Sequence, residues 1–247
     1  MQIAYQSDIG KHRQSNQDAV GAYVNHSGAH LLLIADGMSG HQGGDVAASL
    51  TIANLGHLFL QTDLSTIVDL NEWLVTALHR ENQQIYQIAQ HNQNLRGMGT
   101  TVVAVIILGN KYVVAHVGDS RVYCLHQRHL LRLTQDHSLV NELVKQGKLT
   151  PQEALNFPQR NIITRSLGIN KNVDIDVNVY SLQPHDLLLL CSDGLTNMVS
   201  EEQIAQVLQD HIKSLDERVQ QLITMANMAG GNDNITVLVA QPDEENE

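Results

Sequence analysis

Cysteines and long apolar runs are both scarce in this chain, and each scarcity excludes a class of protein. The two cysteines, Cys124 and Cys191, lie inside apolar strand-like stretches, and neither opens a Cys-x5-Arg loop. We expect both to be buried, reduced and structural, which argues against a cysteine-nucleophile phosphatase. No apolar run approaches the ~20 residues of a membrane span. Residues 1–5 show no basic or apolar signal region, so we expect a cytoplasmic protein.

Basic and aromatic residues are also few. The chain has 15 Lys and Arg against 26 Asp and Glu, a formal net charge of −11. This balance argues against nucleic acid as a partner, because a phosphate backbone is bound by Lys and Arg. Aromatic residues make up 4% of the 247 residues and apolar residues 43%. We therefore expect a soluble globular chain whose core is mainly Leu, Val, Ile and Ala.

Apolar strand-like segments recur along the chain, and several follow one another too closely for a crossover helix. Residues 101–108 meet 111–117 across Gly109-Asn110, and 122–125 are separated from 130–133 by a short polar turn. Such pairs form antiparallel hairpins. Their near-continuous apolar composition predicts strands covered on both faces. The predicted strands are Ile3–Asp8, Ala19–Asn25, His30–Asp36, Thr100–Leu108, Lys111–Gly118, Arg121–His126, His129–Leu133, Asp174–Tyr180, Asp186–Ser192 and Ile235–Ala240.

Amphipathic segments supply helices that would cover these strands. The stretch 137–163 interrupts the strand pattern and contains a short helix with a second, capped turn at Thr150–Glu153, so we interpret it as a helical insertion. Residues 242–247 read as a frayed tail. Together the elements predict a layered α+β fold with two packed sheets. The other predicted helices are Gly44–Leu60, Asp69–Gln90, Ile204–Leu208 and Leu215–Met228.

Four aspartates stand where apolar strands end or begin, each beside a turn-forming residue: Asp36, Asp119, Asp193 and Asp233. One Asp-Gly after a strand is usually just a turn. Several converging carboxylates would repel one another unless hard cations neutralised them. The 13 histidines show no His-Glu-x-x-His or Cys/His spacing, which disfavours zinc. All-oxygen ligands indicate Mg²⁺ or Mn²⁺.

Two further side chains gain meaning beside such a centre. Arg13 in isolation is a solvated charge, but next to bound metal its planar fork suits a phosphate. His41, in a glycine-rich turn that leads into a helix, is either an ordinary loop histidine or a candidate acid. The Asp174-x-Asp176 pair looks like a metal motif but lacks the EF-hand glycine, since Val179 stands at position six. We interpret it as part of a strand.

An ordered series of short motifs resembles the metal-dependent PP2C-type (PPM) serine/threonine protein phosphatases, especially the compact bacterial members. Any one of these motifs is weak evidence, whereas eight in family order, over essentially the whole chain, are highly specific. The motifs are Asp8-x-Gly10-x-x-Arg13-x-x-Asn16-Gln17-Asp18, Asp36-Gly37-Met38-Ser39-Gly40-His41, Gly99-Thr100-Thr101, Gly118-Asp119-Ser120-Arg121, Asp136-His137-Ser138, Thr164-Arg165-Ser166-Leu167-Gly168, Ser192-Asp193-Gly194-Leu195 and Gly231-Asn232-Asp233-Asn234-Ile235-Thr236.

The resemblance implies a fold and a set of metal ligands. The fold is an αββα sandwich of two antiparallel sheets flanked by helices, here a single domain over residues 1–241. Asp36 corresponds to the carboxylate that bridges two Mn²⁺ or Mg²⁺ ions, and Gly37 to a carbonyl ligand. Asp193 and Asp233 match the remaining direct ligands. Asp119, together with Asp193, matches a third, weaker metal site seen in bacterial relatives.

The remaining correspondences concern the substrate. Asp18 matches an acid that contacts metal-bound water, Arg13 the phosphate-binding arginine, and His41 the proposed general acid. The insertion 137–163 matches the flap, which is thought to influence substrate access.

The implied activity is hydrolysis of phosphoserine and phosphothreonine by direct attack of a metal-bridging hydroxide. We expect a monomeric phosphatase that acts on phosphorylated proteins and opposes a bacterial serine/threonine kinase. Two alternatives stay open: a non-catalytic regulator that keeps the fold but binds a kinase or transcription factor, and a phosphatase with one narrow target such as an anti-sigma antagonist. Loss of metal ligands would indicate the regulator, and here all are present.

Overall fold

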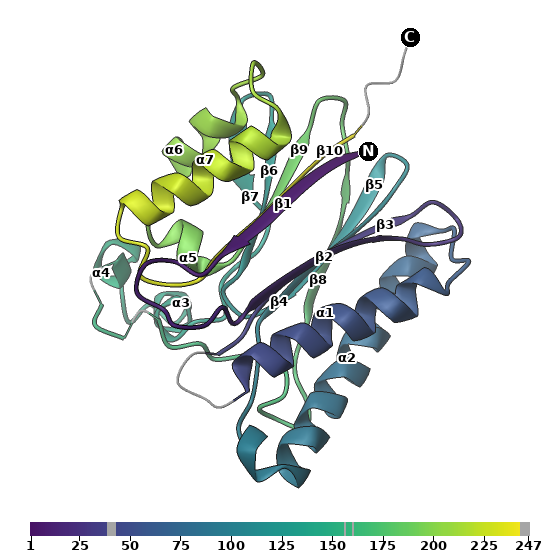
Figure 1. Ribbon diagram of the computed structural model, residues 1–247, viewed down its shortest axis with the longest axis vertical. Helices are drawn as coiled ribbons and strands as arrows, with labels where there is room; N and C mark the ends of the chain where they lie inside the picture. Colours follow the sequence, from purple (N-terminus) through teal and green to yellow (C-terminus); the bar gives the residue numbers. More distant parts are fainter. Residues whose placement is uncertain (39–42, 156, 160, 243–247) are drawn as a thin grey trace.

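Two five-stranded antiparallel sheets form the centre of the protein (Figure 1). The computed structural model describes residues 1–38, 43–155, 157–159 and 161–242. The strands are β1 (Gln2–Asp8), β2 (Asp18–Val24), β3 (His30–Asp36), β4 (Val102–Leu108), β5 (Lys111–Val117), β6 (Arg121–His126), β7 (His129–Arg132), β8 (Asp176–Ser181), β9 (Leu187–Cys191) and β10 (Ile235–Gln241). One sheet has the order β1-β10-β9-β6-β7, and the other β2-β3-β4-β5-β8.

The predicted hairpins are confirmed. β4 and β5 pair with Leu108 opposite Lys111, and β6 pairs with β7 with His126 opposite His129. Strand ends differ from the prediction by one or two residues. β4 begins only at Val102, because Thr100 instead forms isolated bridges to Gly37 and to Leu167.

Helices cover the outer face of each sheet, which confirms the predicted αββα layers (Figure 1). α1 and α2 pack on the sheet that contains β2, β3 and β5, whereas α6 and α7 lie over the sheet that contains β1 and β10. The helices are α1 (Gly44–Leu60), α2 (Ile67–His91), α3 (Leu139–Lys145), α4 (Pro151–Leu155), α5 (Asp193–Thr196), α6 (Glu201–Leu208), α7 (Leu215–Met228) and the 3₁₀ turn η1 (Gln93–Leu95).

The strands are apolar at successive positions because both faces of each sheet are covered. Along β3, Leu31 and Leu33 join the core under α1 and α2, while Leu32 and Ile34 join the core between the sheets. All four are fully buried, and each burial contributes roughly 1.5–3 kcal/mol of hydrophobic stabilisation. Because successive side chains of a strand point to opposite faces, both positions must be apolar. The low aromatic content is thus compatible with a dense aliphatic core.

Helix boundaries follow local capping chemistry. Ser200 and Ser214 open α6 and α7 with complete capping boxes, in which Gln203 and Glu217 are the reciprocal partners. The predicted start of α2 at Asp69 was two residues late. Its N-cap is Thr66, whose hydroxyl accepts the Asp69 N–H, so the helix begins directly after the capping residue, before the first residue of the apolar stripe.

The insertion 137–163, which we call the flap, carries α3 and α4 at one end of the sandwich (Figure 1). Its two ends pair with each other, because Ser138 bridges Ile163 and the Leu139 N–H donates to the Ile162 carbonyl. The expected capped turn is present, since Thr150 and Glu153 bond reciprocally. Within the described part of the chain, every helix is too short or too polar to cross a membrane.

Candidate functional site

Five aspartates from distant parts of the sequence converge beside the flap. Asp18 begins β2 and Asp36 ends β3, where the two residues are direct partners in the antiparallel ladder. Asp119 follows β5, Asp233 precedes β10, and Asp193 follows β9. The predicted convergence of carboxylates at the sheet ends is therefore present, and we call these five residues the aspartate cluster.

Burial and mutual repulsion both raise the pKa values of the aspartate cluster. Burial is the largest cause that raises the pKa of Asp36 well above its usual range, and the charges of Asp18, Asp193, Asp119 and Asp233 add to it. Burial also raises the pKa of Asp193, followed by the charge of Asp119. Burial raises the pKa values of Asp18 and Asp119 to about 6. Such a set of carboxylates is stable in its ionised form only beside positive charge.

The oxygen atoms of the cluster fit a bound cation. Asp18 Oδ1 and Asp119 Oδ1 are buried and lack a hydrogen-bond partner among the described residues. A buried carboxylate oxygen without a donor is costly, and a hard divalent ion satisfies it. All five residues of the cluster are partly exposed to solvent, so an ion can reach the site. The residues present therefore fit a magnesium or manganese site.

A chain of hydroxyl groups fixes the other oxygen of Asp18. Oδ2 accepts from Ser192 Oγ at 2.7 Å and from Thr236 Oγ1 at 2.6 Å. Because Thr236 gives its proton to the carboxylate, Ser7 Oγ must donate to Thr236 Oγ1, at 2.7 Å, and Asn16 Nδ2 donates in turn to Ser7. This chain turns Oδ1 of Asp18 away from the hydroxyls and leaves it for the cluster.

Thr236→Val should weaken Mn²⁺ binding about tenfold, the low end of the loss that follows removal of a residue supporting a metal ligand. Valine keeps the shape of this fully buried side chain but removes one of the two hydroxyl donors to Asp18. Titration of the metal-free protein with Mn²⁺, followed by electron paramagnetic resonance, measures the affinity. Thr236→Ser keeps the donor and should bind almost as the parent does. Equal affinity of the Val variant and the parent would contradict this role.

Metal-free protein should gain more stability from Mn²⁺ at pH 7.5 than at pH 5. The pKa values of Asp18 and Asp119, about 6 when folded, exceed the ordinary value of 3.8. Between pH 3.8 and about 6, the folded form therefore holds more protons than the unfolded form. The free energy of unfolding of the metal-free protein falls as the pH rises through this range. Thermal melting with EDTA and with Mn²⁺ at both pH values measures the difference. A smaller Mn²⁺ effect at pH 7.5 would refute the expected repulsion.

Arg13 is placed beside the cluster by a loop that Asn234 holds. The Asn234 amide donates to the carbonyls of Ile9 and Ser15 at 2.9 and 3.0 Å, and its oxygen accepts the Gln17 N–H at 2.8 Å. Sequence reasoning assigned Asn234 no role, although its place directly after Asp233 was a signal. Its side chain ties the N-terminal loop to a turn of the aspartate cluster.

The guanidinium of Arg13 contacts the cluster directly. Its Nη2 lies 2.8 Å from Asp233 Oδ2, and both side chains are about one-third exposed, at 35% and 31%. Arg13 is thus close to the carboxylates, as a phosphate-binding residue beside a metal centre must be. The candidate acid His41 lies outside the described residues.

Backbone packing places the remaining site residues. The Gly37 N–H donates to the Gln17 carbonyl at 3.0 Å, and an added Cβ at Gly37 would lie 2.3 Å from the Gly44 carbonyl oxygen. Only glycine fits between these segments. Asp193 was predicted to follow a strand through Ser192, but β9 ends at Cys191 and Asp193 is the first residue of α5. A short helix thus orients this carboxylate.

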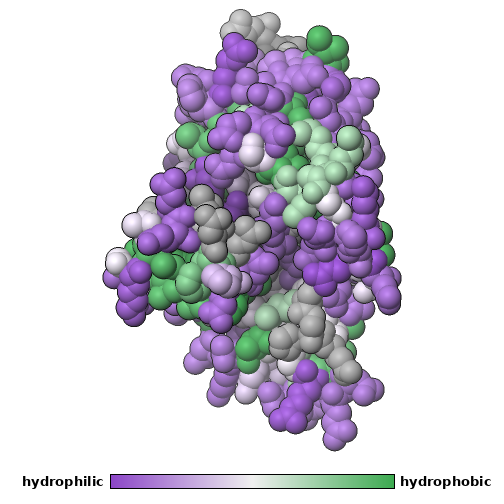
Figure 2. Space-filling view, turned by 90° about the vertical axis from the view of Figure 1, so that its left-hand side faces the viewer, coloured by the Kyte–Doolittle hydropathy of each residue, from purple (hydrophilic) through white to green (hydrophobic). Residues whose placement is uncertain are grey.

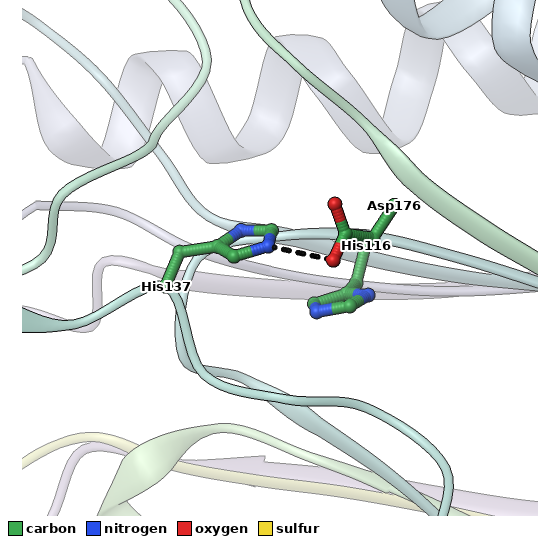
Figure 3. Close-up of side chains that lie close together, drawn as sticks. All are labelled: His116, His137 and Asp176. Carbon is green, nitrogen blue, oxygen red and sulfur yellow. Dashed lines mark ion pairs between the residues drawn. The ribbon is translucent and has the colours of Figure 1, made fainter. Parts of the chain in front are cut away.

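A second group of possible metal ligands lies at the base of the flap (Figure 3). His116 on β5, His137 and Asp176 on β8 place ligand atoms within 4.8 Å of one another. The two imidazole rings stack with centroids 4.6 Å apart. The sequence interpretation of Asp176 as an ordinary strand residue missed this group, because only the pairing of β8 with β5 sets Asp176 opposite His116.

Hydrogen bonds indicate that this second group is structural. His137 Nδ1 accepts the Gly118 N–H at 3.1 Å, so the neutral ring carries its proton on Nε2, which faces Asp176 Oδ2 at 3.3 Å (Figure 3). Arg165 Nη1 lies 2.9 Å from Asp176 Oδ1. Burial is the main cause that lowers the pKa of His137 to about 4. A protonated Nε2 and a guanidinium at the same place oppose a cation.

His137 also anchors the flap. The His137 N–H donates to the Gly118 carbonyl at 2.9 Å, and the His137 carbonyl accepts the Thr164 N–H at 2.8 Å. His137 thus joins both ends of the flap to the backbone next to Asp119. This contact fixes the flap relative to the aspartate cluster.

Comparisons with known proteins agree with this geometry. The family model described as protein phosphatase 2C matches residues 10–228, and the chain belongs to this family of phosphatases. It is 42% identical over 245 residues to "Protein phosphatase PhpP" of Streptococcus pneumoniae, covering 99% of both chains.

Solved structures show the same fold. The serine/threonine phosphatase of S. agalactiae superposes with a TM-score of 0.93 at 45% identity, covering 98% of this chain and 99% of that one. The catalytic domain of the serine/threonine protein phosphatase PstP, in complex with two manganese ions, superposes with a TM-score of 0.84 at 38% identity and covers 97% of both chains.

Proposed function

We propose that this protein is a phosphoprotein phosphatase that hydrolyses phosphoserine and phosphothreonine with the help of Mn²⁺ or Mg²⁺. The main support for the proposal is the aspartate cluster. Its raised pKa values and its two buried oxygens without a hydrogen-bond partner among the described residues favour the binding of divalent cations. Membership of the protein phosphatase 2C family and the two manganese ions of PstP support it.

Every member of the cluster has a role in this proposal. Asp36 and the Gly37 carbonyl, together with Asp193 and Asp233, would hold two ions. Asp119, with Asp193, would hold a third ion. Asp18 is held by two hydroxyls and is suited to accept a hydrogen bond from metal-bound water. When bound, the divalent ions supply a water molecule whose pKa is lowered to near neutrality.

The chain's own groups then act on the phosphate ester. Arg13 orients the phosphoryl oxygens through its planar fork and stabilises their charge. His41, which lies outside the described residues, is the candidate that returns a proton to the leaving serine or threonine oxygen. Burial raises the pKa values of Cys124 and Cys191 to about 11 and about 12, so neither thiol is an available nucleophile. Direct attack by water, which the family resemblance implies, is the route that we propose.

The organisation around the site belongs to the same proposal. Residues 1–241 form one phosphatase domain, with the flap as a subdomain beside the active site. We infer a monomeric cytoplasmic enzyme that opposes a bacterial serine/threonine kinase. The formal net charge of −11 of the chain disfavours nucleic acid as a partner. The intact set of carboxylates favours catalysis over a purely regulatory binding role.

Phosphate release from a phosphothreonine peptide tests the proposal. Activity should appear with Mn²⁺ or Mg²⁺, disappear with EDTA, and return when Mn²⁺ is restored in excess. Release that continues undiminished in EDTA would refute metal-dependent hydrolysis.

Arg13→Ala should raise KM about tenfold and change kcat less, because it removes a phosphate contact made before and during the reaction. The same change frees Asp233 from its 2.8 Å ion pair, so Mn²⁺ affinity should stay equal or increase. Steady-state kinetics and Mn²⁺ titration measure the two effects. Arg80→Ala, at an exposed position of α2, is the matched control and should behave as the parent. An unchanged KM, or a loss of Mn²⁺ affinity, would contradict the assigned role.

A further inference from the structure

A cavity of about 340 Å³ opens between the aspartate cluster and the flap. Asp119 and Asp193 belong to its lining, so the cavity is continuous with the proposed catalytic centre. Its volume is at the lower end of the range for ligand pockets. It has room for one side chain and the adjoining backbone of a bound peptide. Figure 2 faces this end of the molecule, where hydrophobic side chains gather at the mid-height at which Figure 1 places the flap helices.

Charges line the inner wall of the cavity and are arranged against a charged occupant. Arg121 donates to both carboxylate oxygens of Asp136 at 3.0 and 2.8 Å, and Arg132 bonds the same carboxylate. An acidic side chain in this space would meet Asp136 as well as Asp119 and Asp193. A basic side chain would meet the two guanidinium groups, which already pair with Asp136. Asp119 and Asp193 would be neutralised by metal in the proposed function, so a charged occupant of either sign finds no unpaired counter-charge in the cavity.

Three aliphatic side chains of the flap also line the cavity. Val140 and Val144 extend from α3 and Ala154 from α4. Val140 is 8% exposed, and Val144 is only partly covered. An uncharged aliphatic side chain would cover these side chains and gain hydrophobic stabilisation.

Amide groups at the rim suit the backbone of an extended peptide. Asn141 donates its side-chain N–H to the Asp136 carbonyl at 3.0 Å, and Asn197 donates to Asp193 Oδ2 at 3.0 Å. Both bonds use the amide nitrogen, and no residue in the described part of the chain is recorded as a donor to either side-chain oxygen. Peptide N–H groups beside the phosphorylated residue are such donors.

We propose that the cavity is a subsite for an aliphatic side chain next to the phosphorylated residue of a protein substrate. The inference rests on the proposed function and deepens it by naming a substrate feature. The flap contributes to selectivity through Val140 and Val144, which act on the neighbouring residue and not on the phosphate. A small phosphate ester that has no neighbouring residues does not use the subsite.

Kinetics on two kinds of substrate test the subsite. The first is para-nitrophenyl phosphate, and the second is a phosphothreonine peptide panel with leucine, phenylalanine, glycine, aspartate or lysine at each of the two positions on either side. With Mn²⁺ present, leucine at one of these positions should raise kcat/KM about tenfold over glycine, a typical gain for an apolar contact. Val144→Asp should abolish that preference and leave turnover of para-nitrophenyl phosphate nearly unchanged.

Matched variants keep the result interpretable. Val68→Asp makes the same change at a 61% exposed position of α2 and should retain the leucine preference. Val144→Ala enlarges the cavity without adding charge and should shift the preference from leucine to phenylalanine. This second variant tests the subsite even if Val144→Asp folds poorly.

The outcomes separate the two proposals. Hydrolysis of both substrates with no leucine preference in the parent would overturn the subsite alone, as would a preference that survives Val144→Asp and stays unshifted in Val144→Ala. A parent preference for aspartate or lysine would overturn its aliphatic character. If neither substrate is hydrolysed, the proposed function is overturned and the subsite with it.

Discussion

Asp36→Asn should lower kcat/KM for a phosphothreonine peptide by at least about a thousandfold, which corresponds to ~4 kcal/mol of transition-state stabilisation. Burial raises the pKa of Asp36, and the charges of all four other cluster members raise it further. In the proposed function Asp36 would be a ligand of both ions, so its replacement by a neutral amide would remove a shared ligand. Metal-assisted charge stabilisation of several kcal/mol depends on that ligand.

The same variant should be more stable than the parent when metal is absent. Repulsion and burial raise the pKa of Asp36 in the folded state, so its ionised form opposes folding at neutral pH. An amide has no charge to bury. Thermal melting in EDTA at pH 7.5 should therefore show a higher melting temperature for Asp36→Asn than for the parent.

Asp63→Asn is the matched control. Its carboxylate is 84% exposed, and its ion-pair partner among the described residues is the exposed His26, so neither activity nor melting temperature should change measurably. Full activity in Asp36→Asn, or a lower melting temperature of its metal-free form, would contradict the role of Asp36.

Gly194→Ala should destabilise the protein by about 2–4 kcal/mol, in the range for a buried steric conflict. An added Cβ would lie 2.0 Å from the backbone oxygen of Asn234, and a backbone atom cannot move aside as the end of a flexible side chain can. Asp193 and Asp233 precede these two residues in the sequence. The close approach of their turns therefore brings two proposed ligands together, and an intruding methyl group would separate them.

Urea denaturation measures the loss of stability, and Mn²⁺ titration measures the accompanying loss of affinity. Gly28→Ala is the control: its φ of +81° strains any side chain, but the added Cβ meets no atom within 4 Å. That strain alone costs about 1–2 kcal/mol and should leave Mn²⁺ affinity intact. A Gly194→Ala protein as stable as the parent would show that the two turns do not need their close contact.

Local patterns in the sequence predicted much of the fold. Two-residue turns such as Gly109-Asn110 determine which neighbouring strands pair, and capping residues such as Ser214 mark helix starts. Both signals depend on residues close together in the chain. Pairing between distant segments left no comparable signal. β1 pairs with β10 over almost the whole length of the chain, and apolar strands offer many equivalent partners.

In the candidate site too, some residues were predictable from the sequence and others were not. Strand-end aspartates were recognisable, because a carboxylate beside a turn-forming residue is visible in the sequence alone. Their supporting groups were not. Thr236 and Ser192 hold Asp18, yet each is an ordinary hydroxyl residue in an apolar stretch. Asp176 meets His137 only in the folded chain. Contacts of this kind arise from tertiary packing, which periodicity does not encode.

Anomalous diffraction from crystals grown with Mn²⁺ tests the central claim most directly. Two strong manganese peaks should lie in the aspartate cluster, both bonded to Asp36, with Asp193 and Asp233 as further ligands. The group formed by His116, His137 and Asp176 should hold no manganese. Absence of metal at Asp36, or a manganese peak at the histidine group in its place, would contradict the account.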